Sequence, residues 1–197
     1  MSTAPSEVRD RLIAAAEHHF RRFGYRRATV DEMTRTAEVG KGSFYLHFPS
    51  KEAAYFEVVE NSLERFVARA EAALRGPGTA PDRLGALVAV AATHYGEDEL
   101  LRSSLMGEDH LVDGPVAERA AELQRARIRG LMAEVLAQGR REGSIRPGLD
   151  PEAAAEVLFE AGWAVVRADL EGRAGLPLST ALDTLNDVVG LGVVSRA

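Results

Sequence analysis

The sequence contains no cysteine, only two lysines and a single tryptophan among its 197 residues. A chain without cysteine has no disulfide, no thiolate zinc site and no cysteine nucleophile. It also has no apolar run approaching the roughly 18 residues of a membrane-spanning helix, and its first residues are polar with no apolar segment behind them. We therefore expect a cytoplasmic protein that makes no contact with a membrane.

Catalytic signatures are also missing. The sequence has no HExxH or GxSxG motif and no dinucleotide-binding glycine pattern. The run Gly40-Lys41-Gly42-Ser43 is not a phosphate-binding loop, because the earlier glycine and the preceding strand are absent. The polar loop from Gly107 to Pro115 contains acids and His110 without a fixed helical spacing, so we interpret it as a solvated loop and expect no metal. No enzymatic activity and no cofactor are expected.

The composition is that of an ordinary globular protein, with 46% hydrophobic and 27% charged residues. Its net charge of −6 is unevenly distributed. Residues 1–52 contain nine Lys or Arg and seven Asp or Glu, a balance of +2, whereas the remainder has fifteen against twenty-three, or −8. A mildly basic head on an acidic body is expected if only the head meets phosphate. The two lysines, Lys41 and Lys51, both lie in that head.

The stretch from Thr29 to Phe56 carries the clearest pattern in the chain. Thr29 followed by Glu32 is a capping box, in which each side chain accepts a hydrogen bond from the other residue's amide at a helix start. Apolar residues then recur at a spacing of four on both sides of a break at residues 38–40, at Met33 and Ala37 and at Phe44 and Phe48. The pattern predicts two short helices that share one small core.

A helix, a short turn and a second, polar-faced helix form a helix-turn-helix, whose second helix enters the DNA major groove. The second predicted helix directs hydrogen-bonding side chains away from the shared core: Lys41, Ser43, Tyr45 and His47. The run AEVGKGSFYLHFPSKEA, preceded by FRRFGYRRATVDEM, resembles the DNA-binding end of the TetR family of bacterial transcriptional regulators. This resemblance covers Val8 to about Phe56.

Two positions depart from the family pattern. Glu38 stands where the family usually has glycine, so we expect a positive φ there. Gly40 stands where a serine or threonine usually caps the second helix, so we expect no side-chain cap. The resemblance assigns DNA contacts to the matching positions, with base or phosphate roles that suit each side chain: Thr29, Arg35, Lys41, Gly42, Ser43, Tyr45, His47 and Lys51. For Arg35, an ion pair with Asp31 is the alternative.

The rest of the chain has the periodicity of helices throughout, and we predict an all-α protein of about nine helices. Residues 1–52 would form a three-helix DNA-binding domain, and residues 53–197 a larger helical domain for effector binding and dimerisation. The first helix should end at Phe23, before Gly24. His19 lies within its apolar face, where we interpret it as a packed, hydrogen-bonded core residue in preference to a ligand or switch.

The helix that Asp150 and Pro151 open has two apolar faces. A helix that is apolar on both sides is buried on both sides, which indicates one face for the body and one for a second copy of the protein. The expected seam is completed by the last helix, and its residues are Leu158, Ala161, Val165, Leu182, Leu185 and Val189. A central helix within one monomer, or a seam on the face of Phe159 and Trp163, are the alternatives.

The family resemblance also implies an effector pocket in the larger domain. Its candidate lining is mostly apolar with a few polar side chains that could anchor a ligand: His94, Tyr95, Met106, Met132, Phe159 and Trp163. The alternative for each of these residues is that it belongs to the hydrophobic core. Arg127 shares a helix face with Leu123 and Ala120. It would therefore form a buried ion pair or bind an acidic group of the effector.

Together these patterns predict a ligand-responsive DNA-binding transcriptional regulator. We expect a homodimeric repressor that a small molecule releases from a pseudo-palindromic, double-stranded operator. An all-helical enzyme and a helical protein-binding module are the alternatives. Only the regulator should bind DNA in a salt-dependent way that vanishes when the head is altered.

Overall fold

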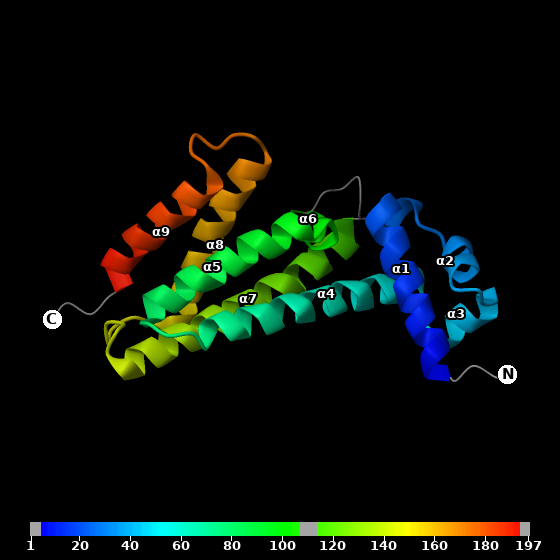
Figure 1. Ribbon diagram of the computed structural model, residues 1–197, viewed down its shortest axis with the longest axis horizontal. Coiled ribbons are helices and arrows are strands. Elements are labelled where there is room, and N and C mark those ends of the chain that lie inside the picture. The colour runs from blue at the N-terminus through cyan, green and yellow to red at the C-terminus, as the bar shows by residue number, and fades with distance from the viewer. Residues whose placement is uncertain (1–4, 107–113, 194–197) are drawn as a thin grey trace. The chain divides into compact units, whose positions relative to one another are not determined.

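The computed structural model describes residues 5–106 and 114–193, and these residues form nine α-helices and no strand (Figure 1). The all-α prediction is therefore confirmed. The helices are α1 (Pro5–Arg27), α2 (Val30–Thr36), α3 (Lys41–His47), α4 (Lys51–Leu74), α5 (Ala80–Glu97), α6 (Glu99–Met106), α7 (Gly114–Glu142), α8 (Pro151–Leu170) and α9 (Leu178–Val193). No helix in these two ranges has both the length and the apolar character that crossing a membrane requires.

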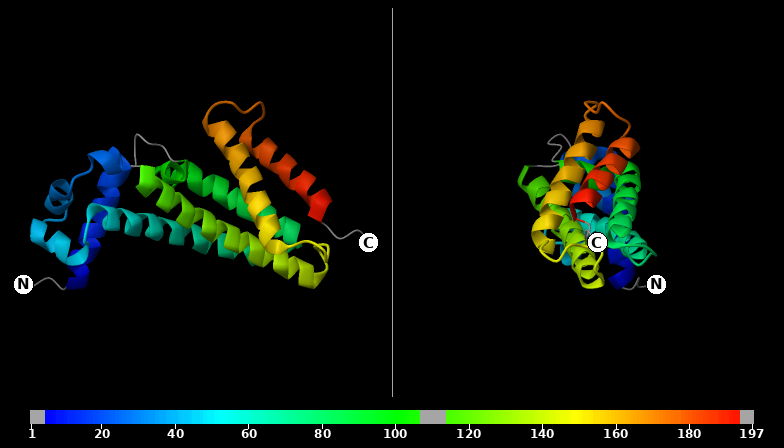
Figure 2. Two further views of the ribbon diagram at one scale, coloured as in Figure 1. Left: turned by 180° about the vertical axis from the view of Figure 1, so that it is seen from behind. Right: turned by 90° about the vertical axis from the view of Figure 1, so that its left-hand side faces the viewer.

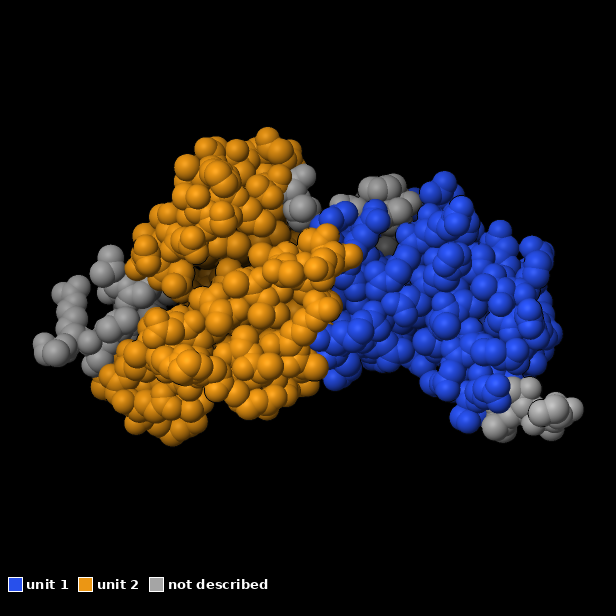
Figure 3. Space-filling view, viewed as in Figure 1, with its two compact units in different colours: residues 1–65, 98–122 blue, residues 66–97, 123–197 orange. Residues whose placement is uncertain are grey.

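The chain divides into two compact units (Figure 3). Unit 1 comprises Met1–Arg65 and Asp98–Glu122, and unit 2 comprises Phe66–Glu97 and Leu123–Ala197. Two of the three divisions fall inside α4 and α7, so each of these helices contributes to both units, and the third lies between α5 and α6. These contact-based units do not test the functional boundary expected between residues 52 and 53, which remains a prediction.

In unit 1, α1 packs against α2 and α3, as Figures 1 and 2 show. The regular part of α1 ends as expected, because Gly24 has a φ of 74° and a ψ of 165° that interrupt the helix before its last turn. Only glycine adopts this conformation readily. The shared core of the three helices consists of fully or almost fully buried apolar side chains: Leu12, Ala16, Phe20, Met33, Phe44 and Phe48.

The turn between α2 and α3 has the local features that the sequence predicts. The capping box of Thr29 and Glu32 is present at the start of α2. Glu38 has a φ of 54°, in the left-handed region, and its amide donates to the carbonyl of Arg35. Gly40 begins α3 without a side-chain cap. The capping box and the two expected departures from the family pattern are all confirmed.

In unit 2, α9 packs against α5 and α8, and both views show α8 and α9 side by side (Figures 1 and 2). The Asp150 side chain caps α8 by accepting from the amides of Glu152 and Ala153, and Pro151 occupies the first turn. This start is the one the sequence predicts. Of the two apolar faces of α8, the one with Phe159 and Trp163 is buried inside the unit.

Candidate nucleic-acid interface

The outward side of α3 is fixed by the two phenylalanines on its inward side. Phe44 is fully buried and Phe48 is 2% exposed, so the orientation of this short helix is set by packing. Tyr45 is 52% exposed on the same helix, while Ser43 and His47 are half-buried. A Cβ added to Gly42 would meet nothing within 4 Å, so the backbone is open to close approach there. The helix therefore presents donors and bare backbone on one surface.

Lys41 lies at the start of α3 and pairs with Asp31 of α2. Its ammonium is 2.8 Å from the Asp31 carboxylate, and both side chains are exposed. The hydrogen bond with Asp31 raises the pKa of Lys41, so the side chain stays cationic. Asp31 was the alternative partner expected for Arg35, which is exposed on α2, but in the structure Asp31 pairs with Lys41. An exposed ion pair is weak, so a phosphate can replace this carboxylate.

Lys51 has a structural role that sequence reasoning missed. Its ammonium donates to the backbone carbonyls of Tyr25 at 2.7 Å and Ala28 at 3.2 Å, and it lies 4.2 Å from the centre of the Tyr25 ring. Carbonyls at a helix end lack partners within the helix, and a cation is favoured there. Lys51 therefore fastens the start of α4 to the end of α1. A phosphate contact by Lys51 remains a prediction.

Thr29 was expected to contact DNA, and the backbone amide with which it could bind a phosphate already has a partner. It donates to Glu32 Oε2 at 3.2 Å, and the Thr29 hydroxyl donates to the same oxygen at 2.6 Å. These hydrogen bonds lower the pKa of Glu32, which keeps the capping box ionised. A DNA contact by Thr29 would have to share this amide, so the structure favours a positioning role for the residue.

His19 is packed inside unit 1 as the sequence analysis interprets it. Its Nε2 atom is 2.8 Å from the Thr36 hydroxyl, and the side chain is 8% exposed. Burial lowers the pKa of His19, and the neighbouring His18 adds to this effect. The neutral ring thus joins α1 to the end of α2, where it helps to fix the helix-turn-helix.

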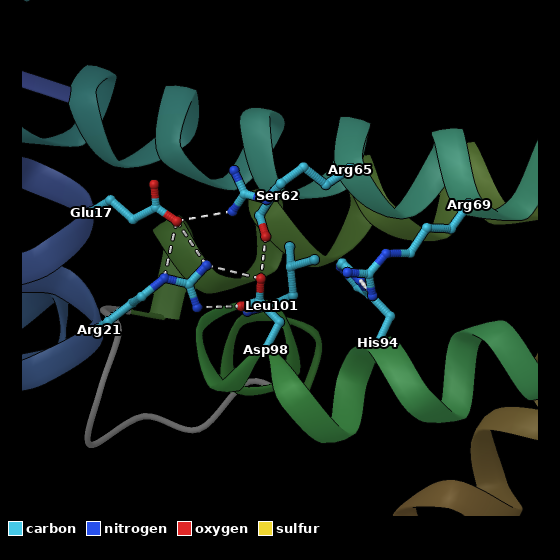
Figure 4. A network of polar contacts seen from close by, with 8 residues as sticks. All are labelled: Glu17, Arg21, Ser62, Arg65, Arg69, His94, Asp98 and Leu101. Atoms are coloured by element: carbon cyan, nitrogen blue, oxygen red, sulfur yellow. Dashed lines mark hydrogen bonds and ion pairs between the residues drawn. The ribbon is translucent and has the colours of Figure 1, made fainter. Parts of the chain in front are cut away.

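A polar network within unit 1 ties α1 to α4 and α6 (Figure 4). The Arg21 guanidinium donates to both carboxylate oxygens of Asp98, at 2.8 and 2.9 Å. The Ser62 hydroxyl and the Leu101 amide also donate to Asp98. Glu17 accepts hydrogen bonds from both Arg21 and Arg65. One carboxylate, only 8% exposed, thereby receives donors from three helices.

The charge state of Asp98 follows from these contacts. Burial favours the neutral carboxyl, but the hydrogen bonds from Arg21, Ser62 and the Leu101 amide outweigh it and lower the pKa of Asp98 to about 2. The hydrogen bonds with Asp98 raise the pKa of Arg21 in return. The ion pair is therefore fully charged at neutral pH. Arg21 belongs to α1, and the apolar side chains of α1 complete the core of the helix-turn-helix, so the ion pair lies close to that motif.

The residues expected to line an effector pocket are buried side chains of unit 2 where the structure describes them. His94, Tyr95, Met132, Phe159 and Trp163 are each between 4% and 7% exposed. The rings of His94 and Tyr95 lie 5.5 and 5.7 Å from that of Phe66. The indole nitrogen of Trp163 is buried and has no hydrogen-bond partner among the described residues. The side chain of Met106 lies outside the described part of the chain.

The buried ion pair considered for Arg127 was wrong, because this side chain is exposed on α7. The buried polar residue of the helix is Gln124, whose Oε1 accepts a hydrogen bond from the Tyr95 hydroxyl at 3.1 Å. Gln124, Ile128 and Leu131 define the buried stripe of α7, and Arg127 lies beside it. A pocket role for Arg127 finds no support in this placement.

The residues expected in a dimer seam lie on the less buried side of α8 and on α9. Leu158, Ala161, Val165 and Leu185 are half-buried, whereas Leu182 is 7% exposed and packs inside unit 2. The side chain of Val189 lies outside the described residues. Two further valines on these helices are far more open, with Val157 67% exposed and Val188 63% exposed.

Two further expectations concern metal and the polar loop. No group of three or more His, Asp or Glu side chains that could hold a metal ion occurs in residues 5–106 and 114–193. Residues 107–113 of the expected loop, including His110, lie outside the described residues, so that interpretation stays a prediction.

Comparison with known proteins agrees with this geometry. Residues 12–58 match the model of bacterial regulatory proteins of the tetR family. The HTH-type transcriptional repressor DhaR of Mycobacterium sp. (strain GP1) is 29% identical over 175 residues, 85% of each chain. The fatty acid metabolism regulator protein of Bacillus subtilis (strain 168) is 22% identical over 148 residues, covering 75% of this chain and 76% of the relative. The crystal structure of the regulator FadR from Bacillus subtilis in complex with stearoyl-CoA aligns with a TM-score of 0.72 at 18% identity, covering 93% and 98% of the two chains.

Proposed function

Because this chain belongs to the tetR family of bacterial regulatory proteins, we propose that it is a transcriptional repressor that a small molecule releases from a palindromic DNA operator. The chain is a regulator and not an enzyme.

The outward face of α3 is the observation that carries the proposal. Lys41 and Tyr45 are exposed on a helix whose orientation is fixed by Phe44 and Phe48. A rigid helix with exposed donors suits the major groove, where side chains meet base edges and the flanking phosphates. The net charge of the head, +2 against −8 for the remainder, favours the approach of DNA to this end.

Replacing both Lys41 and Tyr45 by alanine should weaken operator binding by roughly 10- to 100-fold. The loss of one phosphate contact should also lower the slope of log affinity against log salt by about one unit. Fluorescence-anisotropy titrations at several salt concentrations measure both quantities. Arg173→Ala, which removes one positive charge from an exposed site in unit 2, is the control and should bind normally. An unchanged affinity in the double variant would refute the assignment to α3.

We also propose that two copies assemble through α8 and α9. The face of α8 with Phe159 and Trp163 is used within unit 2, while the opposite face keeps Val157 and Leu158 open or half-buried. A second copy would cover this face. Two heads related by two-fold symmetry would then bind half-sites about one turn of DNA apart, or a multiple of it.

The proposed effector is small and partly apolar, and it binds beside Trp163. A buried indole N–H without an acceptor is costly, and a ligand carrying an oxygen acceptor would satisfy it. Phe159 lies buried on the same face of α8, and the Arg167 guanidinium lies 5.8 Å from the centre of the Trp163 ring. The FadR structure contains stearoyl-CoA, whose acyl group is a long apolar chain.

An effector of this kind should change the fluorescence of Trp163 and weaken operator binding by about 5- to 150-fold, the usual range of coupling between two sites. The signal is easy to assign because Trp163 is the only tryptophan. Compounds are screened by fluorescence and then titrated with and without saturating operator. Trp163→Phe keeps most of the packing but removes the donor and the fluorescence signal, so its weaker binding of the effector should be measured by isothermal titration calorimetry. Equal effector affinity with and without DNA would exclude regulation through this site.

A further inference from the structure

α3 directs one large apolar side chain out of the protein. Leu46 is 85% exposed, the highest value among the exposed large hydrophobic side chains in the described part of the chain. A single exposed leucine is common on protein surfaces and needs no functional explanation. What distinguishes Leu46 is its position on the helix.

Leu46 lies at the centre of the outward side of α3. At 100° per residue it projects about 180° from the midpoint of Phe44 and Phe48, the two residues that anchor the helix. Gly42 lies one turn earlier on the same stripe, and a Cβ added there would meet nothing within 4 Å. The stripe therefore consists of bare backbone followed by the two methyl groups of a leucine.

The donors of α3 lie to the sides of this stripe. Tyr45 and His47 each project about 100° from Leu46, on opposite sides. Lys41 projects about 140° on the side of Tyr45, and the half-buried Ser43 about 60° on the side of His47. When α3 enters a groove with its outward side first, the flanking donors face the groove walls, where the phosphates lie. Leu46 then faces the floor, where the base edges lie.

Base edges in the major groove offer hydrogen-bonding groups and a single apolar group, the C5 methyl of thymine. Leucine has no donor or acceptor, so placing it over a polar edge would strip water from that edge without replacing its hydrogen bonds. We propose that Leu46 reads a thymine in each half-site through this methyl group and so determines operator sequence. The inference rests on the proposed function, since only binding in the major groove brings Leu46 to a base.

The test begins with operators selected by the wild-type protein from random duplex DNA. Each thymine of the selected half-site is then replaced by deoxyuridine, which keeps the base pair and removes only the methyl group. One position per half-site should lose about fourfold in affinity for the wild type, the effect of one buried methyl. Leu46→Ala should bind the thymine operator more weakly and should not distinguish thymine from uracil at that position.

Tyr45→Phe serves as the matched control, because it alters the adjacent exposed side chain while leaving Leu46 in place, and it should keep the preference for thymine. The melting temperature of Leu46→Ala should equal that of the wild type, since so exposed a side chain contributes little packing. A selected operator without any methyl-sensitive thymine, or one whose methyl effect persists in Leu46→Ala, overturns this inference alone. Failure of the wild type to select any sequence would overturn the proposed function, and this inference with it.

Discussion

Replacing Arg21 by methionine is expected to lower the free energy of unfolding by about 3 to 5 kcal/mol, the usual cost of breaking a buried ion pair from one side. The change leaves the Asp98 carboxylate, 8% exposed, with hydrogen bonds only from Ser62 and the Leu101 amide. Methionine retains much of the length of the arginine side chain, so the loss reports the charge more than the packing. Urea unfolding followed by circular dichroism measures the difference.

Arg65→Met is the matched control because it removes an arginine from the same network at an exposed position. Arg65 pairs with Glu17 at 2.9 Å, and its side chain is 47% exposed. Exposed ion pairs contribute at most about 1 kcal/mol, so this variant should remain close to the wild type. If Arg21→Met is no less stable than Arg65→Met, the Asp98 cluster does not hold unit 1 together.

The same cluster should make stability depend on pH in acid. The pKa of Asp98 is about 2 in the folded protein, against 3.8 for the free carboxyl. A carboxyl whose pKa is lowered on folding stabilises the protein above its unfolded pKa, and this contribution is lost as pH falls through the folded pKa. Asp98 should therefore contribute about 2 kcal/mol above pH 4 that disappears between about pH 4 and pH 2.

In Arg21→Met, burial should raise the pKa of Asp98, because the main opposing interaction is gone. The difference in stability between wild type and variant should then shrink as the pH falls, since a protonated Asp98 no longer needs Arg21. Other carboxyls titrate in both proteins and cancel in this difference. A gap that stays constant from pH 7 to pH 3 would contradict the buried ion pair.

The helices could be predicted from the sequence because their signals are local. The capping box at Thr29, the glycine at position 24 and the Asp150-Pro151 start each act within a few residues of the end that they define. The positive φ of Glu38 was predictable from the family resemblance, because Glu38 stands where the family usually has glycine. Elements defined within one or two turns of chain need no knowledge of the remaining fold.

The polar contacts that fix the candidate site could not be predicted in this way. Arg21 and Asp98 are 77 positions apart, and Lys51 meets carbonyls 23 and 26 positions earlier in the chain. No local pattern encodes such pairs. The position of Arg127 was also misjudged when the side chains of α7 were assigned to helix faces from sequence spacing alone. In a helix of 29 residues the stripe that faces inward is decided by packing, and here it runs through Gln124.

Burial also changes how the α8 faces are interpreted. Their sequence periodicity shows two apolar faces without saying which one meets a second copy. In the structure Phe159 and Trp163 are used within unit 2, and among the described large apolar side chains of α8 it is Val157 that is exposed, at 67%. The alternative seam on the Phe159 and Trp163 face therefore loses support. Val157 becomes the position where dimerisation is tested with least damage to the fold.

Replacing Val157 by glutamate should convert the proposed dimer to monomers and lower operator affinity by about 10²- to 10⁴-fold, because each half-site would then be bound without the other. At 67% exposure the change costs little in a single chain, whereas a charge buried in the seam costs several kcal/mol. Leu158→Glu should act in the same way but with some loss of monomer stability, since that side chain is half-buried.

Ala72→Glu, which adds the same charge at an exposed position of α4, is the control and should stay dimeric. Sedimentation velocity at micromolar concentration measures the mass, and titration of one-half-site and two-half-site duplexes measures the loss of paired binding. A Val157→Glu protein that sediments as the wild-type dimer and still prefers the full operator would place the seam away from this face of α8.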